Sequence, residues 1–296
     1  CPLCTRYVVY ILSVDEAGES WVGLRTLMAL ELERVLSSLF RDSVSVVIIR
    51  SIDEWGSLIR VGPEGLVVVN THGELVPIPM EYGKDWRAFY SRLAELIRER
   101  GWIFVNPVGC GFYFVGNARV EGVGDRYAVG LDGPVYLSVA LGRPFLPYQQ
   151  YAWTGDRFMV LRKSRLSMMG RQVFSALRLS MPEEVDIEWP LLTADQPEWY
   201  LYELELENAT LYAGVCMRAG KGILCWGGLT ARPLEEKISI AVAMVALSLG
   251  LPLPRTNQAD HGTRWALPLA AVAAVALIVI LKHMKRSKKR SKDLMC

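Results

Sequence analysis

The sequence predicts an α/β fold: a doubly wound, mostly parallel sheet with insertions, followed by a single C-terminal transmembrane helix. Three observations lead to this prediction. Short apolar runs alternate with segments of helical periodicity through the first 115 residues. The apolar runs are continuous, which is typical of strands that are covered on both faces. One uncharged run of 17 residues, 265–281, lies close to the end of the chain.

The first part of the chain supplies four strands and the helices between them. The apolar runs predict strands at 7–12, 44–49, 66–69 and 102–105. Helical spacing predicts a helix within 20–40, a short helical or irregular connection at 51–59, and a helix that Asp85 caps and Gly101 ends. Right-handed crossovers give a parallel sheet with the strand order 2-1-3-4, the flavodoxin-like arrangement. In such sheets, ligands bind at the carboxyl ends of the strands.

The rest of the domain is less regular. Residues 112–197 are interpreted as insertions that decorate the sheet rather than as a second domain. They include a turn at 131–134 between strand-like runs and a helix at 164–179. After them, 201–226 predicts a β-hairpin, and 234–249 predicts an apolar helix that closes the domain.

The apolar run 265–281 is expected to cross a bilayer as one helix. Its length of about 25 Å is at the short end for such helices, and Arg264 and Lys282 can snorkel outward to extend it. The alternative is a buried core helix, but a polycationic tail follows directly and leaves no chain to cover it. The chain therefore divides into an extracytoplasmic α/β domain (1–250), a stalk (251–264), the transmembrane helix (265–281) and a basic cytoplasmic tail (282–296).

The charge distribution sets the expected topology and partners. The last fifteen residues hold seven Lys or Arg and one acid, which the positive-inside tendency places in the cytoplasm. Subtracting them from the totals leaves 26 basic and 30 acidic residues, a net charge of about −4. A mildly acidic body without a basic stripe argues against nucleic-acid binding. We expect a single-pass protein of the cell membrane, with the lipid bilayer as one partner and a protein as a second.

Three further features agree with an external domain. Asn208 begins a glycosylation sequon. Cys216 and Cys225 lie in strand-like runs on either side of a Gly-rich turn, so they form either a cross-strand disulfide or two buried free thiols. A secretory signal removed before Cys1 would fit the same topology.

The candidate site lies where two neighbouring predicted strands end. His72 follows the third strand and Cys110 the fourth, so both are expected at one edge of the sheet, where they can form a thiolate–imidazolium pair. Candidate ligand-binding residues around them are Asn70, Gly73, Glu74, Gly109 and Gly111. In the alternative, inert interpretation, His72 bonds a carboxylate such as Glu74, and Cys110 is a small buried residue at a tight turn.

This region resembles the caspase-like (clan CD) cysteine peptidases. The resemblance is carried by an apolar strand ending in His72-Gly73, a helix, and a strand ending near Cys110, with the histidine 38 residues before the cysteine. It covers residues 7 to about 115, and it implies that His72 acts as the base and Cys110 as the nucleophile. The link 106–109 before Cys110 is longer than in that family.

The segment 219–228 is similar to the closing part of non-catalytic members of the class I glutamine amidotransferase-like superfamily. The nucleophile elbow of that family is Gly-x-Cys-x-Gly, whereas Val108 and Phe112 occupy the glycine positions around Cys110. The cysteine of that family also precedes its histidine, the reverse of this chain. The resemblance therefore implies the flavodoxin-like fold and not the activity.

No metal and no cofactor are expected. The three histidines, His72, His261 and His283, do not cluster with cysteines as zinc ligands do. Three functions remain: a non-catalytic module that binds a ligand or partner at the sheet edge, a membrane-tethered cysteine hydrolase, and a subunit of a membrane assembly. The first is preferred because the catalytic motifs match imperfectly.

Overall fold

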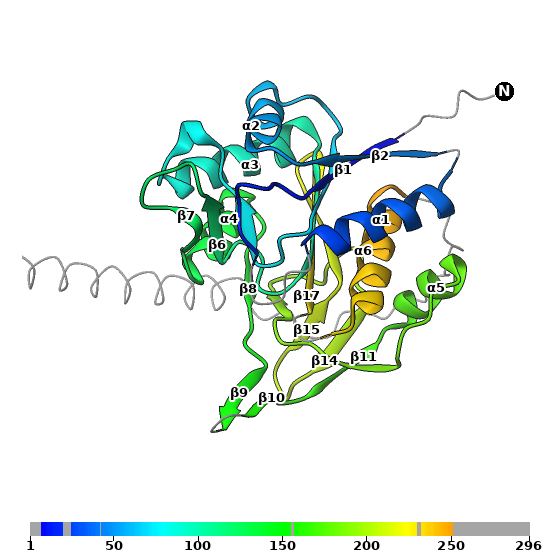
Figure 1. Cartoon of the computed structure of the whole chain (residues 1–296). Helices are drawn as coiled ribbons and strands as arrows, with labels where there is room; N and C mark the ends of the chain where they lie inside the picture. The colour runs from blue at the N-terminus through cyan, green and yellow to red at the C-terminus, as the bar shows by residue number, and fades with distance from the viewer. Residues whose placement is uncertain (1–6, 20–24, 42, 155–156, 230–231, 251–296) are drawn as a thin grey trace, which may run out of the picture. The chain divides into compact units, whose positions relative to one another are not determined.

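A computed structural model describes residues 7–19, 25–41, 43–154, 157–229 and 232–250 (Figure 1). The predicted stalk, transmembrane helix and cytoplasmic tail, 251–296, lie outside these residues. None of the helices in the described part combines the length and apolar character needed to cross a bilayer. The described residues belong to one compact unit, with the exception of 194–196.

The centre of the domain is a six-stranded, mostly parallel sheet with the order β16-β17-β5-β3-β1-β2. The four strands predicted from the apolar runs are confirmed, and they lie in the predicted order as β2-β1-β3-β5. β17 extends the sheet in parallel to β5, and β16 returns antiparallel to β17. The bounds are β1 Tyr7–Leu12, β2 Val44–Ile49, β3 Val67–Asn70, β5 Ile103–Val108, β16 Val215–Ala219 and β17 Gly222–Leu229.

Helices cover both faces of this sheet, which is why its strands read as continuous apolar runs. On one face, α2 (Ile52–Val61) and α3 (Trp86–Arg100) contribute to a core that includes Val68 and Phe104. On the other face, α1 (Arg25–Leu39) and α6 (Leu234–Ser248) lie side by side, as Figure 1 shows. α5 (Met168–Leu177) packs against α6.

The ends of α3 follow the sequence signals. The side chain of Asp85 accepts a hydrogen bond from the backbone N–H of Ala88 at 3.0 Å, which caps the first turn. Gly101 ends the helix with a φ of 71°, a left-handed conformation that glycine adopts without steric cost. The helix predicted between Asp85 and Gly101 is therefore confirmed.

The segment 112–197, predicted as insertions, contributes strands to three further sheets of the described compact unit, together with short strands from outside that segment. The largest has six short strands in the order β12-β11-β14-β15-β13-β8, and the others are the three-stranded β4-β6-β7 and the hairpin β9–β10. The bounds are β4 Leu75–Pro77, β6 Phe114–Asn117, β7 Gly124–Ala128, β8 Phe145–Pro147, β9 Tyr151–Thr154, β10 Arg157–Val160, β11 Lys163–Leu166, β12 Glu184–Asp186, β13 Leu191–Thr193, β14 Tyr202–Glu205 and β15 Thr210–Ala213, with a 3-10 turn η1 at Met80–Tyr82.

Three predictions for this region were wrong in detail. The predicted turn at 131–134 begins a helix, α4 (Asp132–Ala140), whose first turn carries an acidic residue that suits the helix dipole. The helix predicted at 164–179 is shorter, because Lys163–Leu166 pairs as β11 and the Ser167 side chain caps α5. The predicted single hairpin at 201–226 is two hairpins, β14–β15 and β16–β17, in different sheets.

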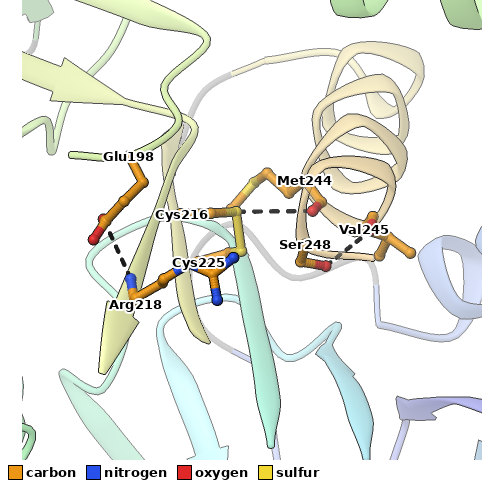
Figure 2. Close-up of a disulfide and its surroundings, with 7 residues drawn as sticks. All are labelled: Glu198, Cys216, Arg218, Cys225, Met244, Val245 and Ser248. Atoms are coloured by element: carbon orange, nitrogen blue, oxygen red, sulfur yellow. Dashed lines mark hydrogen bonds between the residues drawn. A yellow bond between two sulfur atoms is a disulfide. The ribbon is translucent and has the colours of Figure 1, made fainter. Parts of the chain in front are cut away.

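Cys216 and Cys225 form a disulfide, which decides between the two alternatives that the sequence leaves open. The two residues are directly opposite each other in β16 and β17, with a Cα–Cα distance of 4.0 Å. Figure 2 shows the bridge facing α6, where Sγ of Cys216 lies 3.7 Å from the carbonyl oxygen of Met244. A disulfide sulfur carries no hydrogen, so this is a packing contact. The bridge therefore lies in the core between the sheet and α6.

Candidate functional site

The carboxyl ends of β3 and β5 carry the predicted site residues, and the structure brings them to one edge of the sheet. Asn70 ends β3, and the turn after it carries His72, Gly73 and Glu74. Cys110 follows β5 in a turn that leads to β6. All of the polar side chains among them are buried. The turns after β3 and β5 therefore lie at the same edge of the sheet, as the strand order predicts. The chemistry available to each side chain depends on its contacts.

Asn70 organises the turn rather than facing outward. Its Nδ2 donates to Oδ1 of Asn106 at 2.7 Å and to the carbonyl of Leu75 at 2.8 Å. Its Oδ1 accepts from the backbone N–H of His72 at 3.2 Å, and the left-handed Gly73, with a φ of 74°, completes the turn. These bonds occupy the side-chain amide of Asn70 inside the domain, so Asn70 shapes the turn after β3.

His72 is a neutral, fully buried histidine held at both ring nitrogens. Its Nε2 accepts from the backbone N–H of Val14 at 3.0 Å, and its Nδ1–H donates to the carbonyl of Gly18 at 2.8 Å. Burial disfavours the charged ring and lowers the pKa of His72 to about 3. The ring therefore ties the turn after β3 to the loop that follows β1.

Cys110 is a buried thiol in its protonated form. Burial raises the pKa of Cys110 well above its usual range, and the carboxyl of Glu74 raises it further. A thiolate–imidazolium pair needs the opposite: a lowered cysteine pKa and a raised histidine pKa. The contacts and charges around His72 and Cys110 thus do not favour the predicted dyad, which stays a prediction.

Glu74 and Asn106 occupy the space that the two glycines beside Cys110 leave open. Its Oε1 accepts the backbone N–H of Cys110 at 3.0 Å. A Cβ on Gly109, whose φ is 69°, would lie 2.3 Å from Cγ of Glu74, and one on Gly111 would lie 2.6 Å from Nδ2 of Asn106. Both glycines, predicted to make room for a ligand, therefore make room for the protein's own side chains.

The backbone after these glycines is strained. Phe112 is a fully buried aromatic residue with a φ of 66°, a conformation that is unfavourable for a residue with a Cβ. The hydroxyl of Tyr90 donates to the carbonyl of Phe112 at 3.1 Å and holds it in place. Stored strain of this kind concentrates at functional sites.

Sequence reasoning missed the second carboxylate of this edge. Glu188, in the loop between β12 and β13, is 1 % exposed. Burial raises the pKa of Glu74, and the charge of Glu188 raises it further. The same two carboxyls lie close enough to Tyr151 to contribute, after burial, to raising its pKa to about 12. The signal in the sequence was one charged residue between Ile187 and Trp189, too weak by itself to predict a site.

We refer to Glu74, Cys110, Gln150, Tyr151 and Glu188 together as the edge cluster. Gln150 joins it because its backbone N–H donates to the carbonyl of Glu188 at 2.9 Å. Within the described part of the chain, no three His, Cys, Asp or Glu side chains gather as metal ligands. The cluster therefore gathers two buried carboxyls, an amide, a thiol and one aromatic ring.

Substituting Glu74 with glutamine is expected to remove a pH-dependent loss of stability. The pKa of Glu74 is raised above 4.5 in the folded protein, so its contribution to stability is full below pH 4.5 and is lost as the pH rises through the folded pKa. Gln keeps the Oε1 acceptor for Cys110 and does not ionise. Urea unfolding from pH 4 to 8 should show the variant gaining on the wild type by about 1.4 kcal/mol per unit of pKa shift.

The matched control is Glu207→Gln, the same change at an exposed position. Its stability difference from the wild type should stay flat over this pH range. If the difference in unfolding free energy between Glu74→Gln and the wild type is equally independent of pH, burial does not raise the pKa of Glu74 and the assignment is wrong.

No protein-family model and no curated protein matches this chain. Its function is therefore argued from the fold and the edge cluster.

Proposed function

We propose that this chain is a membrane-anchored, extracytoplasmic domain that binds a ligand or partner at the carboxyl edge of its parallel sheet and catalyses no reaction. The observation that carries the proposal is the state of the two predicted catalytic side chains. His72 is locked neutral between two backbone groups, and Cys110 is buried as a thiol. Neither side chain is in the form that nucleophilic catalysis needs.

The sheet itself supports binding at this edge. The order β2-β1-β3-β5 and the helices on both faces support the interpretation of a doubly wound, flavodoxin-like sheet. In sheets of that kind, ligands bind beyond the carboxyl ends of the strands. Glu74 and Glu188 are buried there, although burial of two carboxyls opposes folding. Polar groups that lower stability are retained where they serve a function.

The extracytoplasmic location has two lines of support. The disulfide between Cys216 and Cys225 is a bond that persists in oxidising compartments. The sequence of 265–281 followed by the basic residues of 282–296 favours one membrane span with the tail in the cytoplasm. In this proposal the lipid bilayer is the partner of 265–281, and the described domain is presented outside.

Alkylation of the native, full-length protein tests the non-catalytic assignment. We expect iodoacetamide to modify Cys110 at least roughly a hundredfold more slowly than an exposed thiol, because the buried, protonated thiol reacts only after local opening. A cysteine at exposed Ser57, introduced as Ser57→Cys, supplies the reference. Site-resolved mass spectrometry separates the two rates.

The variant His72→Ala distinguishes the two interpretations. If His72 is structural, its loss loosens the edge and leaves labelling of Cys110 equal or faster. If Cys110 in the wild type reacts faster than the Ser57→Cys thiol and His72→Ala slows it, the two residues form a dyad and the proposal is wrong.

A further inference from the structure

The two lateral edges of the central sheet differ in how their backbone groups are used. β16 forms one edge, and on its outer side the backbone N–H of Cys216 donates to the carbonyl of Trp199 at 2.9 Å. The backbone N–H of Arg218 donates to the carboxylate of Glu198 at 3.3 Å (Figure 2). β2 forms the other edge, and no strand of the described residues pairs with its outer side. One lateral edge is therefore closed and the other is open.

Alternation along β2 decides which backbone groups face the open side. The carbonyls of Ser43 and Ile49 accept hydrogen bonds, at 2.8 and 2.9 Å, from the backbone of β1 and of the residue after it. Backbone groups alternate between the two sides of a strand, so the odd-numbered residues from 43 to 49 face β1. The even-numbered residues between them, among which are Val46 and Ile48, point their N–H and C=O groups outward.

The outward N–H groups at the two ends of β2 already have partners. The N–H of Val44 donates to a carbonyl in the preceding turn at 2.9 Å. The N–H of Arg50, directly after the strand, donates to the carboxylate of Glu54 at 3.3 Å. Among the described residues, no hydrogen bond uses the outward groups of Val46 and Ile48. These two residues therefore offer two donors and two acceptors to a further strand.

β2 lacks the features with which proteins usually protect an edge strand. Its residues, Val44–Ile49, include neither a charged residue nor proline, and they pair with β1 without a register shift. Val47 is 43 % exposed, and Val8 on the neighbouring strand is 37 % exposed. Leu30 and Leu39 of α1, the helix that contacts β2, are exposed as well. An apolar, regular edge of this kind favours pairing with another strand.

We propose that this chain forms a symmetric dimer in which β2 pairs antiparallel with β2 of a second copy. One antiparallel register satisfies all of the open groups: Val46 of each copy exchanges both of its hydrogen bonds with Ile48 of the other. The two-fold axis then passes beside Val47, and the two exposed Val47 side chains cover each other. The central sheets of the two copies join into one continuous sheet.

The charges around β2 favour a second copy as the partner. Identical strands that pair place like charges near each other around the axis, and the absence of charge within Val44–Ile49 removes that repulsion. Antiparallel pairing also holds the two Arg50 side chains about 20 Å apart, whereas a parallel pair would place them side by side. Because the β16 edge is closed, the assembly ends with two copies and does not grow into a filament.

Cysteine cross-linking tests the contact on the axis. The experiment uses the full-length protein in detergent, with Cys1, Cys4 and Cys296 replaced by serine. Opposite Cα atoms at a non-hydrogen-bonded position of an antiparallel pair lie about 4.5 Å apart, within the range of a disulfide. Oxidation of Val47→Cys with copper phenanthroline should therefore give a covalent dimer on a non-reducing gel. Val61→Cys, the same change at an exposed valine of α2, should stay monomeric.

A charge on the axis should separate the copies. Val47→Lys places two ammonium groups opposite each other, so the dissociation constant of the dimer should rise roughly a hundredfold or more. Multi-angle light scattering of the full-length protein across a dilution series measures this constant. Val61→Lys is the matched control and should dimerise like the wild type. Circular dichroism checks that each variant is folded, and the cross-linking of Val47→Cys decides the question if Val47→Lys is not.

Three outcomes would overturn the inference. The first is a wild-type protein that stays monomeric across the dilution series. The second is a dimer that the folded Val47→Lys variant leaves intact, because the contact would then lie elsewhere, for example in the predicted membrane segment 265–281. The third is cross-linking of Val47→Cys that does not exceed that of Val61→Cys. The dimer goes beyond the proposed function and does not depend on the reactivity of Cys110, so the two fail separately.

Discussion

Replacing His72 with alanine is expected to lower the free energy of unfolding at pH 7 by about 3 to 5 kcal/mol. The substitution leaves the buried N–H of Val14 and the carbonyl of Gly18 without their partners and opens a cavity beneath the turn after β3. Urea unfolding of the full-length protein measures the loss. A change below about 1 kcal/mol would mean that the His72 ring does not stabilise the contact between the turn after β3 and the loop after β1.

The same variant should change how stability depends on pH. The pKa of His72 is about 3 in the folded protein and 6.5 when the chain is unfolded. Below pH 6.5 the unfolded chain binds a proton that the folded chain does not, so the contribution of His72 is full above pH 6.5 and is lost as the pH falls. The wild type should lose about 1.4 kcal/mol per pH unit relative to His72→Ala between pH 6 and 4.

The control for this slope is His261→Ala, which removes another of the three histidines. If the buried ring of His72 is the source of the slope, His261→Ala keeps the slope of the wild type. If His261→Ala flattens the pH dependence and His72→Ala does not, the buried neutral state of His72 is incorrect.

Removing the disulfide is expected to lower the free energy of unfolding by about 2 to 3 kcal/mol, because its loop of sequence separation 9 no longer restricts the unfolded chain. The variant is the double substitution Cys216→Ala with Cys225→Ala. Both cysteines are fully buried against α6, so lost packing adds to the effect.

Reductant provides the internal control for this prediction. It should destabilise the wild type and leave the double variant unchanged when both are unfolded in urea. Titration of free thiols in the unreduced, denatured wild type should not detect Cys216 or Cys225. Detection of both thiols would contradict the bond and remove one support for the extracytoplasmic location.

The elements predicted from the sequence match the structure best where local chemistry and long-range packing favour the same element. The strands β1, β2, β3 and β5 are apolar throughout because both of their faces are covered, and that pattern is visible in the chain itself. α3 carries its own start and stop signals in Asp85 and Gly101. The short strands of the second sheet have three to four residues each and no such signal, so their pairing could not be predicted.

The sequence by itself determined four strands of the parallel sheet, because continuous apolar runs encode burial on both faces directly, and right-handed crossovers predicted their order. It also predicted that the turns carrying His72 and Cys110 follow neighbouring strands at one edge of the sheet. Only the tertiary structure decided the protonation states and the hydrogen-bond partners of the residues at that edge. The partners of His72 lie 58 and 54 residues away, and Glu74 reaches a backbone N–H 36 residues away. Gln150 and Glu188 arrive at the edge through a ladder between distant strands. Protonation and hydrogen bonding depend on burial and on neighbours in space, and neither is encoded in the spacing of residues along the chain.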